Sequence, residues 1–145
     1  MKKLIGQSMV DAQLITNGQL LDLLEFQSKS KERTLLGRLS VNLGLVTDEE
    51  FAPFIASYFN VPFVNLKQSP PPAREAVELV PEVIAKRLNI APLTKKDDTL
   101  TIAVTDPVDL TAIENLETIT HCRIKTVVST PCQIKHTIAI SYGIL

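Results

Sequence analysis

A repeat with an offset of 31 residues fills the first sixty residues and is the strongest constraint on the fold. Leu-Ile-Gly at residues 4–6 recurs as Leu-Leu-Gly at 35–37, and Leu-Ile-Thr at 14–16 recurs as Leu-Val-Thr at 45–47. Every match has the same offset, so one sequence plan is present twice. Two copies of one plan predict two copies of one structural unit.

Each copy has the pattern of a helix–turn–helix unit. A short amphipathic helix ends at a tight break, at Gln13 in the first copy and at Gly44 in the second. A threonine then begins the next helix with a capping-box partner three residues on. These predicted pairs are Thr16 with Gln19 and Thr47 with Glu50. At helical spacing, the second helices are expected to bury Leu20, Leu21, Leu23 and Leu24 in copy one, and Phe51, Phe54, Ile55 and Tyr58 in copy two.

The chain changes its pattern after a stiff linker with three consecutive prolines. Residues 1–66 are predicted to form a duplicated helical subdomain packed as a four-helix bundle, residues 67–72 the linker, and residues 73–145 a small α/β sheet subdomain. The fold class is therefore α+β. The predicted elements of the second part are a helix at 81–88, strands at 90–93, 100–104 and 124–128, a helix capped by Asp109 and running to Thr120, and a helix begun by Thr130 and Pro131 with Gln133 completing a capping box.

Composition excludes several classes of protein. The chain is 45% hydrophobic and has 15 basic against 16 acidic residues, which is too apolar and too balanced for a disordered chain. The same balance argues against binding of nucleic-acid polymers, which requires cations for the phosphates. No apolar run approaches the length of a membrane span or of an export signal. The two cysteines, Cys122 and Cys132, are expected to be buried reduced thiols.

The repeat resembles the tandem motif of the MshEN-type domain, the N-terminal domain of type II secretion and type IV pilus assembly ATPases. Copy one is LIGQSMVDAQLITNGQLLDLLEFQ and copy two is LLGRLSVNLGLVTDEEFAPFIASY. The segment VPFVNL at 61–66, the segment LTIAVTDPVDL at 100–110 and the closing Ser-Tyr-Gly also resemble that family. The resemblance covers essentially the whole chain.

The resemblance implies a cyclic di-GMP site in which each copy binds half of the dinucleotide. The residues that it assigns are Ile5, Gly6, Leu14, Ile15, Gln27, Leu36, Gly37, Arg38, Gly44, Leu45 and Val46. A glycine at a helix start permits close approach of a phosphate, or equally of a neighbouring helix. The departures from the motif are Leu4 and Leu35 in place of both arginines, Gln13 in place of a glycine, Ser40 at an aliphatic position and Tyr58 in place of a glutamine.

The family's ATPase core has no counterpart in this sequence, which lacks a G-x-x-x-x-G-K-[S/T] phosphate loop. We therefore expect a non-enzymatic regulatory or protein-interaction module, with a cyclic di-GMP receptor as the alternative. The implied partners are an inner-membrane platform protein or an ATPase of the machinery. The implied position is cytoplasmic, at the inner membrane through such a partner. The sequence leaves open a free-standing domain or part of a longer chain, and Met1 favours a natural start.

Other chemistry is not predicted. Cys132 and His136 have helical i, i+4 spacing, but His121 and Cys122 are adjacent, and neither pair matches a zinc-ligand motif. The Cys–His adjacency also lacks the geometry for nucleophilic catalysis. The Asp-Pro-Val-Asp segment at 106–109 is expected to form a turn and a helix cap. No cofactor, metal or catalytic residue is therefore assigned.

Overall fold

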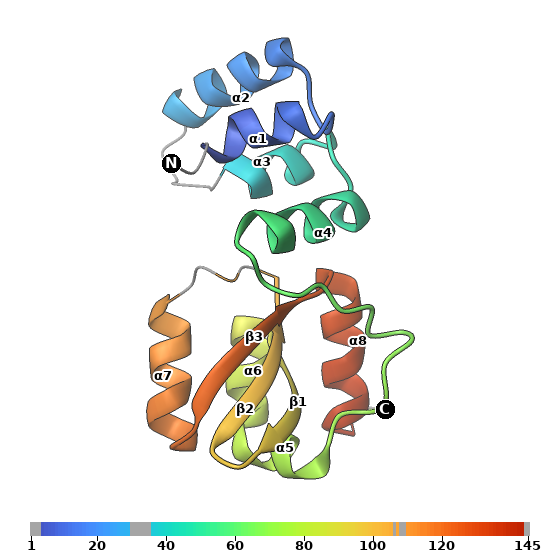
Figure 1. Ribbon diagram of the computed structural model, residues 1–145, viewed down its shortest axis with the longest axis vertical. Coiled ribbons are helices and arrows are strands. Elements are labelled where there is room, and N and C mark those ends of the chain that lie inside the picture. Colours follow the sequence, from blue (N-terminus) through green and yellow to red (C-terminus); the bar gives the residue numbers. More distant parts are fainter. Residues whose placement is uncertain (1–3, 30–35, 106, 108–109, 144–145) are drawn as a thin grey trace. The chain divides into compact units, whose positions relative to one another are not determined.

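The computed structural model describes residues 4–29, 36–105, 107 and 110–143 and has an α+β fold (Figure 1). The described part contains eight helices and one three-stranded sheet. The chain divides into two compact units, Met1–Phe54 and Ile55–Leu145. The predicted fold class is therefore confirmed.

The first unit repeats one local structure. Helices α1 (Ile5–Asp11) and α3 (Leu36–Asn42) begin the two copies, and α2 (Asn17–Lys29) and α4 (Asp48–Tyr58) follow them. Both capping boxes are present. Thr16 Oγ1 accepts from the N–H of Gln19 at 3.1 Å and Gln19 Oε1 accepts from the N–H of Thr16 at 2.8 Å. Thr47 and Glu50 make the same two bonds at 3.2 Å.

The first helix of each copy ends in the same way. Gln13 has φ +62° and Gly44 has φ +80°, so both adopt the left-handed conformation that closes a helix. The next residue in each copy donates to a carbonyl five positions back, from Leu14 to Met9 and from Leu45 to Ser40. This bond pattern satisfies helix carbonyls that would otherwise lack partners. The predicted breaks are confirmed, with a glutamine holding a conformation that favours glycine.

The prediction for α2 was partly wrong. Leu23 is buried, but Leu21 is 67% exposed and Leu24 is 45% exposed. At 100° per residue, Leu20, Leu23 and Gln27 lie on one face of the helix, whereas Leu21 points away from it. Four closely spaced leucines cover more of the helix circumference than one packing face can bury. In α4 the prediction holds better, because Phe51 and Ile55 are buried and Phe54 and Tyr58 are half-buried.

The second unit is a three-layer arrangement around a small sheet. Strand β1 (Ala91–Lys96) pairs antiparallel with β2 (Thr99–Val104), and β2 pairs parallel with β3 (Arg123–Val128). Asp97, at φ +55°, makes the tight turn between β1 and β2. Helix α7 (Leu110–Thr120) connects the two parallel strands, as a crossover must. Leu110 begins α7, and the predicted cap Asp109 lies outside the described residues.

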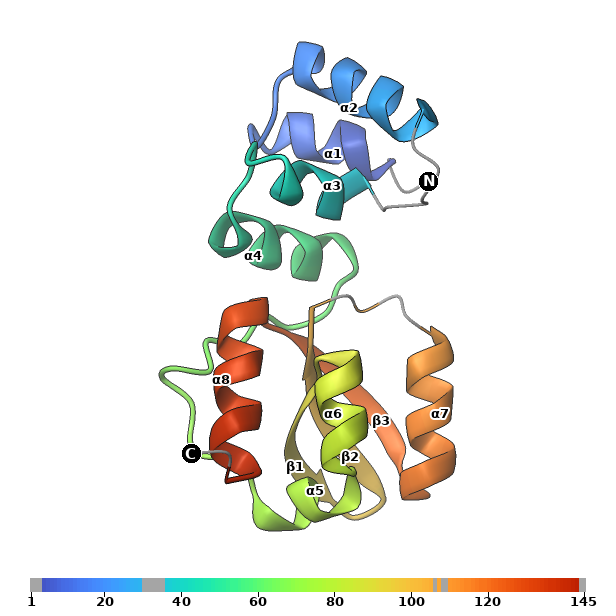
Figure 2. The same cartoon turned by 180° about the vertical axis from the view of Figure 1, so that it is seen from behind.

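Helices cover both faces of the sheet. Helices α5 (Arg74–Leu79), α6 (Glu82–Leu88) and α7 contribute to one core cluster, in which Leu100, Ile102 and Val104 of β2 are buried. Helix α6 lies behind the strands in Figure 1 and in front of them in Figure 2. Helix α8 (Pro131–Ser141) packs on the other face, where Ile134 and Ile138 meet Ala91 and Ala103. Helix α5 was not predicted.

The boundary between the parts differs from the predicted one. The sequence predicts residues 61–66 as the end of the N-terminal part, but they belong to the second unit. Phe63 forms a parallel bridge to Val128, and the N–H of Val64 donates to the carbonyl of Val128 at 2.9 Å. This segment extends the sheet beside β3. The two compact units are Met1–Phe54 and Ile55–Leu145, so they divide inside α4.

The start of α8 also differs in one detail. Thr130 caps the helix as predicted, because its side chain accepts from the N–H of Gln133 at 3.3 Å. The Gln133 side chain does not complete a capping box. Its Oε1 instead accepts from the N–H of Leu66 at 2.8 Å and from Ser129 Oγ at 3.1 Å. Gln133 therefore fastens the segment before the linker to α8.

Tyr142 closes the second unit at the end of α8. Its hydroxyl donates to the carbonyl of Val80 at 2.8 Å, joining α8 to the connection between α5 and α6. Burial of the phenol and the negative charge of Glu82 raise the pKa of Tyr142 to about 12, from the ordinary tyrosine value of 10.0. Both effects disfavour the phenolate.

The Tyr142 contact predicts a stability change at high pH. The pKa in the folded state is raised, so the stabilisation is complete below pH 10 and is lost as pH rises from 10 toward 12. In a Tyr58→Phe chain, which retains Tyr142 as its single tyrosine, near-ultraviolet absorbance should titrate with a midpoint near 12. A further Tyr142→Phe change should remove this pH dependence from urea unfolding. A midpoint near 10 would contradict the buried, bonded hydroxyl.

Candidate ligand site in the duplicated unit

The eleven residues assigned to a dinucleotide site all lie in the first unit, on α1, α2, α3 and the two turns. Their exposure differs widely. Gly6, Ile15, Leu36, Gly37 and Val46 are buried, Ile5, Leu14, Gln27, Arg38 and Leu45 are half-buried, and Gly44 is exposed. Nearly half of the assigned set is therefore buried in the packing of the first unit.

The two repeated glycines are close-packing positions. A Cβ at Gly6 would lie 2.6 Å from Leu20 Cδ1 and 2.8 Å from Leu36 Cδ2. A Cβ at Gly37 would lie 2.4 Å from Phe51 Cζ. Leu20 and Phe51 are themselves 31 residues apart, so each copy seats a side chain of its second helix on the glycine of its first. The structure thus favours the helix-packing interpretation of these glycines.

The contact between Gly6 and Leu36 also joins the copies. Gly6 belongs to α1 and Leu36 to α3, so the N-terminal ends of the two first helices lie together. The geometry brings together the residues that the motif repeats, as a site shared by both copies requires. The packing of Leu20 and Phe51 on the repeated glycines was not predicted, although the offset of 31 residues between these two side chains indicated that they have equivalent positions.

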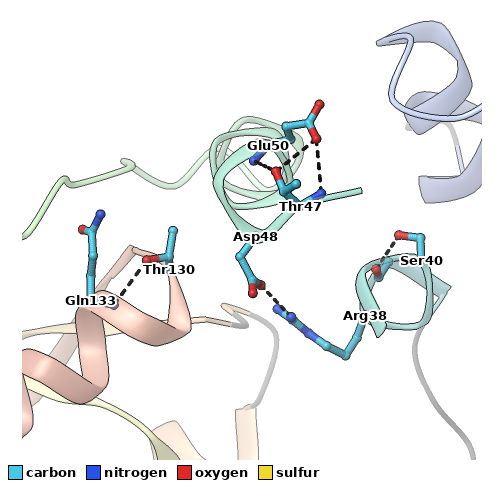
Figure 3. A network of polar contacts seen from close by, with 8 residues as sticks. Arg38, Ser40, Thr47, Asp48, Glu50, Thr130 and Gln133 are labelled. Carbon is cyan, nitrogen blue, oxygen red and sulfur yellow. Dashed lines mark hydrogen bonds and ion pairs between the residues drawn. The ribbon is translucent and has the colours of Figure 1, made fainter. Parts of the chain in front are cut away.

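Arg38 is the described cation nearest in sequence to the repeated glycines, and it is already paired. Its Nη1 donates to Asp48 Oδ1 at 2.8 Å, and both side chains are about one-third exposed (Figure 3). The guanidinium also lies over the Phe51 ring, 5.5 Å from its centroid. Asp48 belongs to the first turn of α4, where a negative charge is favourable. An anionic ligand that used Arg38 would compete with this pair.

One departure from the family motif, Ser40, has a local explanation in this fold. Ser40, at an aliphatic position, is fully buried, and its hydroxyl donates to the carbonyl of Gly37 at 2.6 Å (Figure 3). The bond satisfies the polar group inside the helix pair. Leu4, at the first arginine position, is 82% exposed. Leu35, at the second, and the nearby cations Lys2, Lys3 and Arg33 lie outside the described residues.

The cysteines and histidines do not gather. Cys122 is buried and its thiol donates to the carbonyl of Thr120 at 3.4 Å. Cys132 is exposed, in contrast to the expectation for both thiols, because it lies on the outer side of the first turn of α8. His121 ends α7 at φ +56° and is not in a strand. Among the described residues, no group of three or more potential metal ligands is present.

The fold and the site define a small α+β domain with a duplicated helix–turn–helix unit and an attached α/β unit. The MshEN domain model matches residues 59–144. The chain therefore belongs to the MshEN domain family. The match falls in the second unit and begins where the chain leaves α4.

Known relatives extend the similarity to the whole chain. The chain is 28% identical over 139 residues to the type IV pilus assembly ATPase PilB of Myxococcus xanthus, covering 96% of this chain and 24% of PilB. It thus spans about a quarter of that relative. A structure described as MshE with cdg has a TM-score of 0.82 and 28% identity, over 97% of this chain and 99% of the other. The N-terminal domain of XpsE has a TM-score of 0.75 and 20% identity, over 95% of this chain and 96% of the other, and supports the fold.

In residues 4–29, 36–105, 107 and 110–143, no helix is both long and apolar enough to cross a bilayer.

The glycine contacts predict a ranking of alanine substitutions. Gly37→Ala should destabilise the chain by roughly 1–3 kcal/mol, because the Phe51 ring must shift to admit a methyl group. Gly6→Ala should cost less, because the flexible ends of Leu20 and Leu36 can turn away. Gly18→Ala is the matched control, since its Cβ would meet only Thr16 Oγ1 at 3.9 Å. Urea unfolding measures the order, and equal effects at all three positions would contradict the packing.

Proposed function

We propose that this chain is a non-enzymatic regulatory and protein-interaction module of a type IV pilus or type II secretion machinery. The observation that carries this proposal is the similarity of the complete two-unit fold to N-terminal ATPase domains. The fold matches MshE over 97% of the chain, and the sequence matches a quarter of PilB. The active groups of such an ATPase would then belong to other domains of the machinery.

The described surface supports a binding role. Large apolar side chains are exposed on both units, including Leu21 and Phe26 on α2, Val83 on α6 and Ile140 on α8. Among the described residues, no group of three or more potential metal ligands occurs. A module of this kind acts by docking on a larger partner.

Direct binding tests the proposal. The chain is immobilised and presented with two purified components of the same cell, the assembly ATPase and the cytoplasmic part of the inner-membrane platform protein. We expect one of them to bind with a Kd in the micromolar range, typical of modest interfaces. An unrelated protein of similar size and net charge is the control. Failure of both components to bind at high micromolar concentration would refute the interaction role.

The second candidate function is reception of cyclic di-GMP. The observation that favours it is the 28% identical structure described as MshE with cdg. The duplicated unit offers two equivalent helix starts, joined at Gly6 and Leu36. Against it stand the leucines at both motif arginine positions and the pairing of Arg38 with Asp48. Each missing charge-assisted bond would cost about 1.5–3 kcal/mol of affinity.

Calorimetry with cyclic di-GMP decides between the two candidates. Gly6→Glu or Gly37→Glu is unsuitable as a binding-site variant, because either side chain would disrupt the helix packing. Arg38→Ala is preferable. In a receptor, the wild-type chain gives saturable heat and Arg38→Ala weakens binding about tenfold or more. Lys29→Ala, at a surface pair with Glu25 on α2, is the charge-matched control. Absence of heat from wild type at high micromolar protein would eliminate the receptor hypothesis.

A further inference from the structure

One face of the sheet is only half covered by α8. The α8 side of the sheet includes Ala91, Ala103 and Val127, which are buried against Ile134 and Ile138. Further along the same strands, the residues on this face become polar and accessible. Cross-strand partners lie on the same side of a sheet, so the register assigns them. They are Thr94, Lys96, Thr99, Thr101, Arg123 and Lys125, here called the cation–threonine face.

The register places the three cations on neighbouring positions. Thr99 lies between Lys96 on β1 and Arg123 on β3, and Thr101 lies between Thr94 and Lys125. Adjacent strands are about 4.8 Å apart and alternate residues about 6.7 Å apart, so the face is a compact grid. Lys96, Arg123 and Lys125 are exposed, and within the described residues none of the three forms an ion pair.

The β3 edge next to this face is open. Val128 exchanges backbone bonds with residues 62 and 64, whereas Ser129 donates to Val104 of β2. Alternate residues of a strand direct their backbone groups to opposite neighbours. Ile124 and Thr126 therefore direct their N–H and C=O groups away from β2, as Val128 does. Among the described residues, no backbone partner for these groups lies on that side.

The chain shows that this edge accepts a strand. The segment around Phe63 pairs in parallel with β3 at Val128 and leaves the remainder of the strand uncovered. Charged side chains on an edge strand discourage uncontrolled pairing. Here they also favour an acidic partner strand, because a strand beside β3 would place alternate side chains next to Arg123 and Lys125.

We propose that the β3 edge and the cation–threonine face together bind an extended acidic segment of a partner protein. The segment adds as a strand beside Ile124 and Thr126, and its alternate Asp or Glu side chains meet Arg123 and Lys125. This proposal names a surface for the interaction role proposed above, and it rests on that role for the identity of the biological partner.

A protein segment fits better than an anionic membrane. Clusters of four to eight cations are typical of binding to anionic lipid, and this face has three. Among the large exposed apolar side chains identified in the described part, Phe63 pairs with Val128, which lies on the opposite side of the sheet. None of the others belongs to a strand, so the cation–threonine face offers none for insertion into a bilayer. The acidic residues closest to it in sequence are Asp97 and Asp98 in the β1–β2 turn, and Lys125 is the cation furthest from that turn in the register.

A peptide titration followed by NMR tests the surface on the full chain. The probe is a terminally blocked heptapeptide in which Glu and Thr alternate, and the control peptide has Lys in place of Glu. The acidic peptide should shift the amide signals of Ile124 and Thr126 and slow their hydrogen exchange. Arg123→Glu with Lys125→Glu should weaken this binding roughly tenfold, whereas Lys135→Glu on α8 should not.

The backbone contribution has its own test. Thr126→Pro removes an N–H that β2 does not use, and proline is tolerated on edge strands with that N–H facing outward. Binding should weaken roughly threefold to tenfold, the effect of one hydrogen bond. Because the variant could misfold, the same loss is also sought with wild-type chain and a peptide N-methylated at its central amides. Undiminished binding of the N-methylated peptide would overturn the strand-addition geometry.

The remaining outcomes separate this proposal from the interaction role. If the Arg123→Glu/Lys125→Glu chain binds the machinery component as tightly as wild type, the role stands and the surface is wrong. If the wild-type chain binds neither machinery component, the proposed interaction role is wrong. The peptide titration still tests whether the β3 edge and the cation–threonine face bind an acidic strand. Absence of peptide binding at millimolar concentration, or binding instead to vesicles of phosphatidylcholine and phosphatidylserine, would overturn the proposal.

Discussion

The contact between a glycine in one helix and a large side chain in the next organises each copy of the duplicated unit. Gly6 admits Leu20, and Gly37 admits Phe51. Helices approach this closely only where one of them lacks a Cβ, so the glycine sets both the distance and the register of the pair. The paired first helices then meet where Gly6 contacts Leu36. The geometry of the candidate ligand site follows from these contacts.

Local signals in the sequence predicted local structure well. The capping boxes at Thr16 and Thr47, the helix breaks at Gln13 and Gly44 and the start of α8 at Thr130 all depend on neighbouring residues. The exposure of Leu21 depends on which face of α2 finds a partner, which periodicity alone does not specify. The same holds for Gln133, whose side chain bonds the N–H of Leu66, 67 residues earlier in the chain.

The candidate site was predictable as a set of positions and not as an environment. Because the repeat marks the glycines and aliphatic pairs, their membership in one unit could be deduced from the offset. The burial of these residues depends on how the helices pack. The Arg38–Asp48 pair joins two helices through residues that are ten positions apart in the sequence. The family match at residues 59–144 lies beyond the repeat, in the unit where the resemblance is carried by the segments at 61–66 and 100–110 and by the closing Ser-Tyr-Gly.

The two units offer recognition chemistry of opposite kinds. In the first, the central cation Arg38 is satisfied by Asp48 and stacked near Phe51, so an incoming anion must replace an existing contact. In the second, Lys96, Arg123 and Lys125 have no counter-ion within the described residues, and the neighbouring strand edge has unused backbone groups. An anionic partner therefore gains electrostatic energy at the cation–threonine face without displacing an existing ion pair. On these grounds the β3 edge is a more favourable surface for an anionic partner than the Arg38 region. The nearly neutral composition of the whole chain does not indicate this local positive charge.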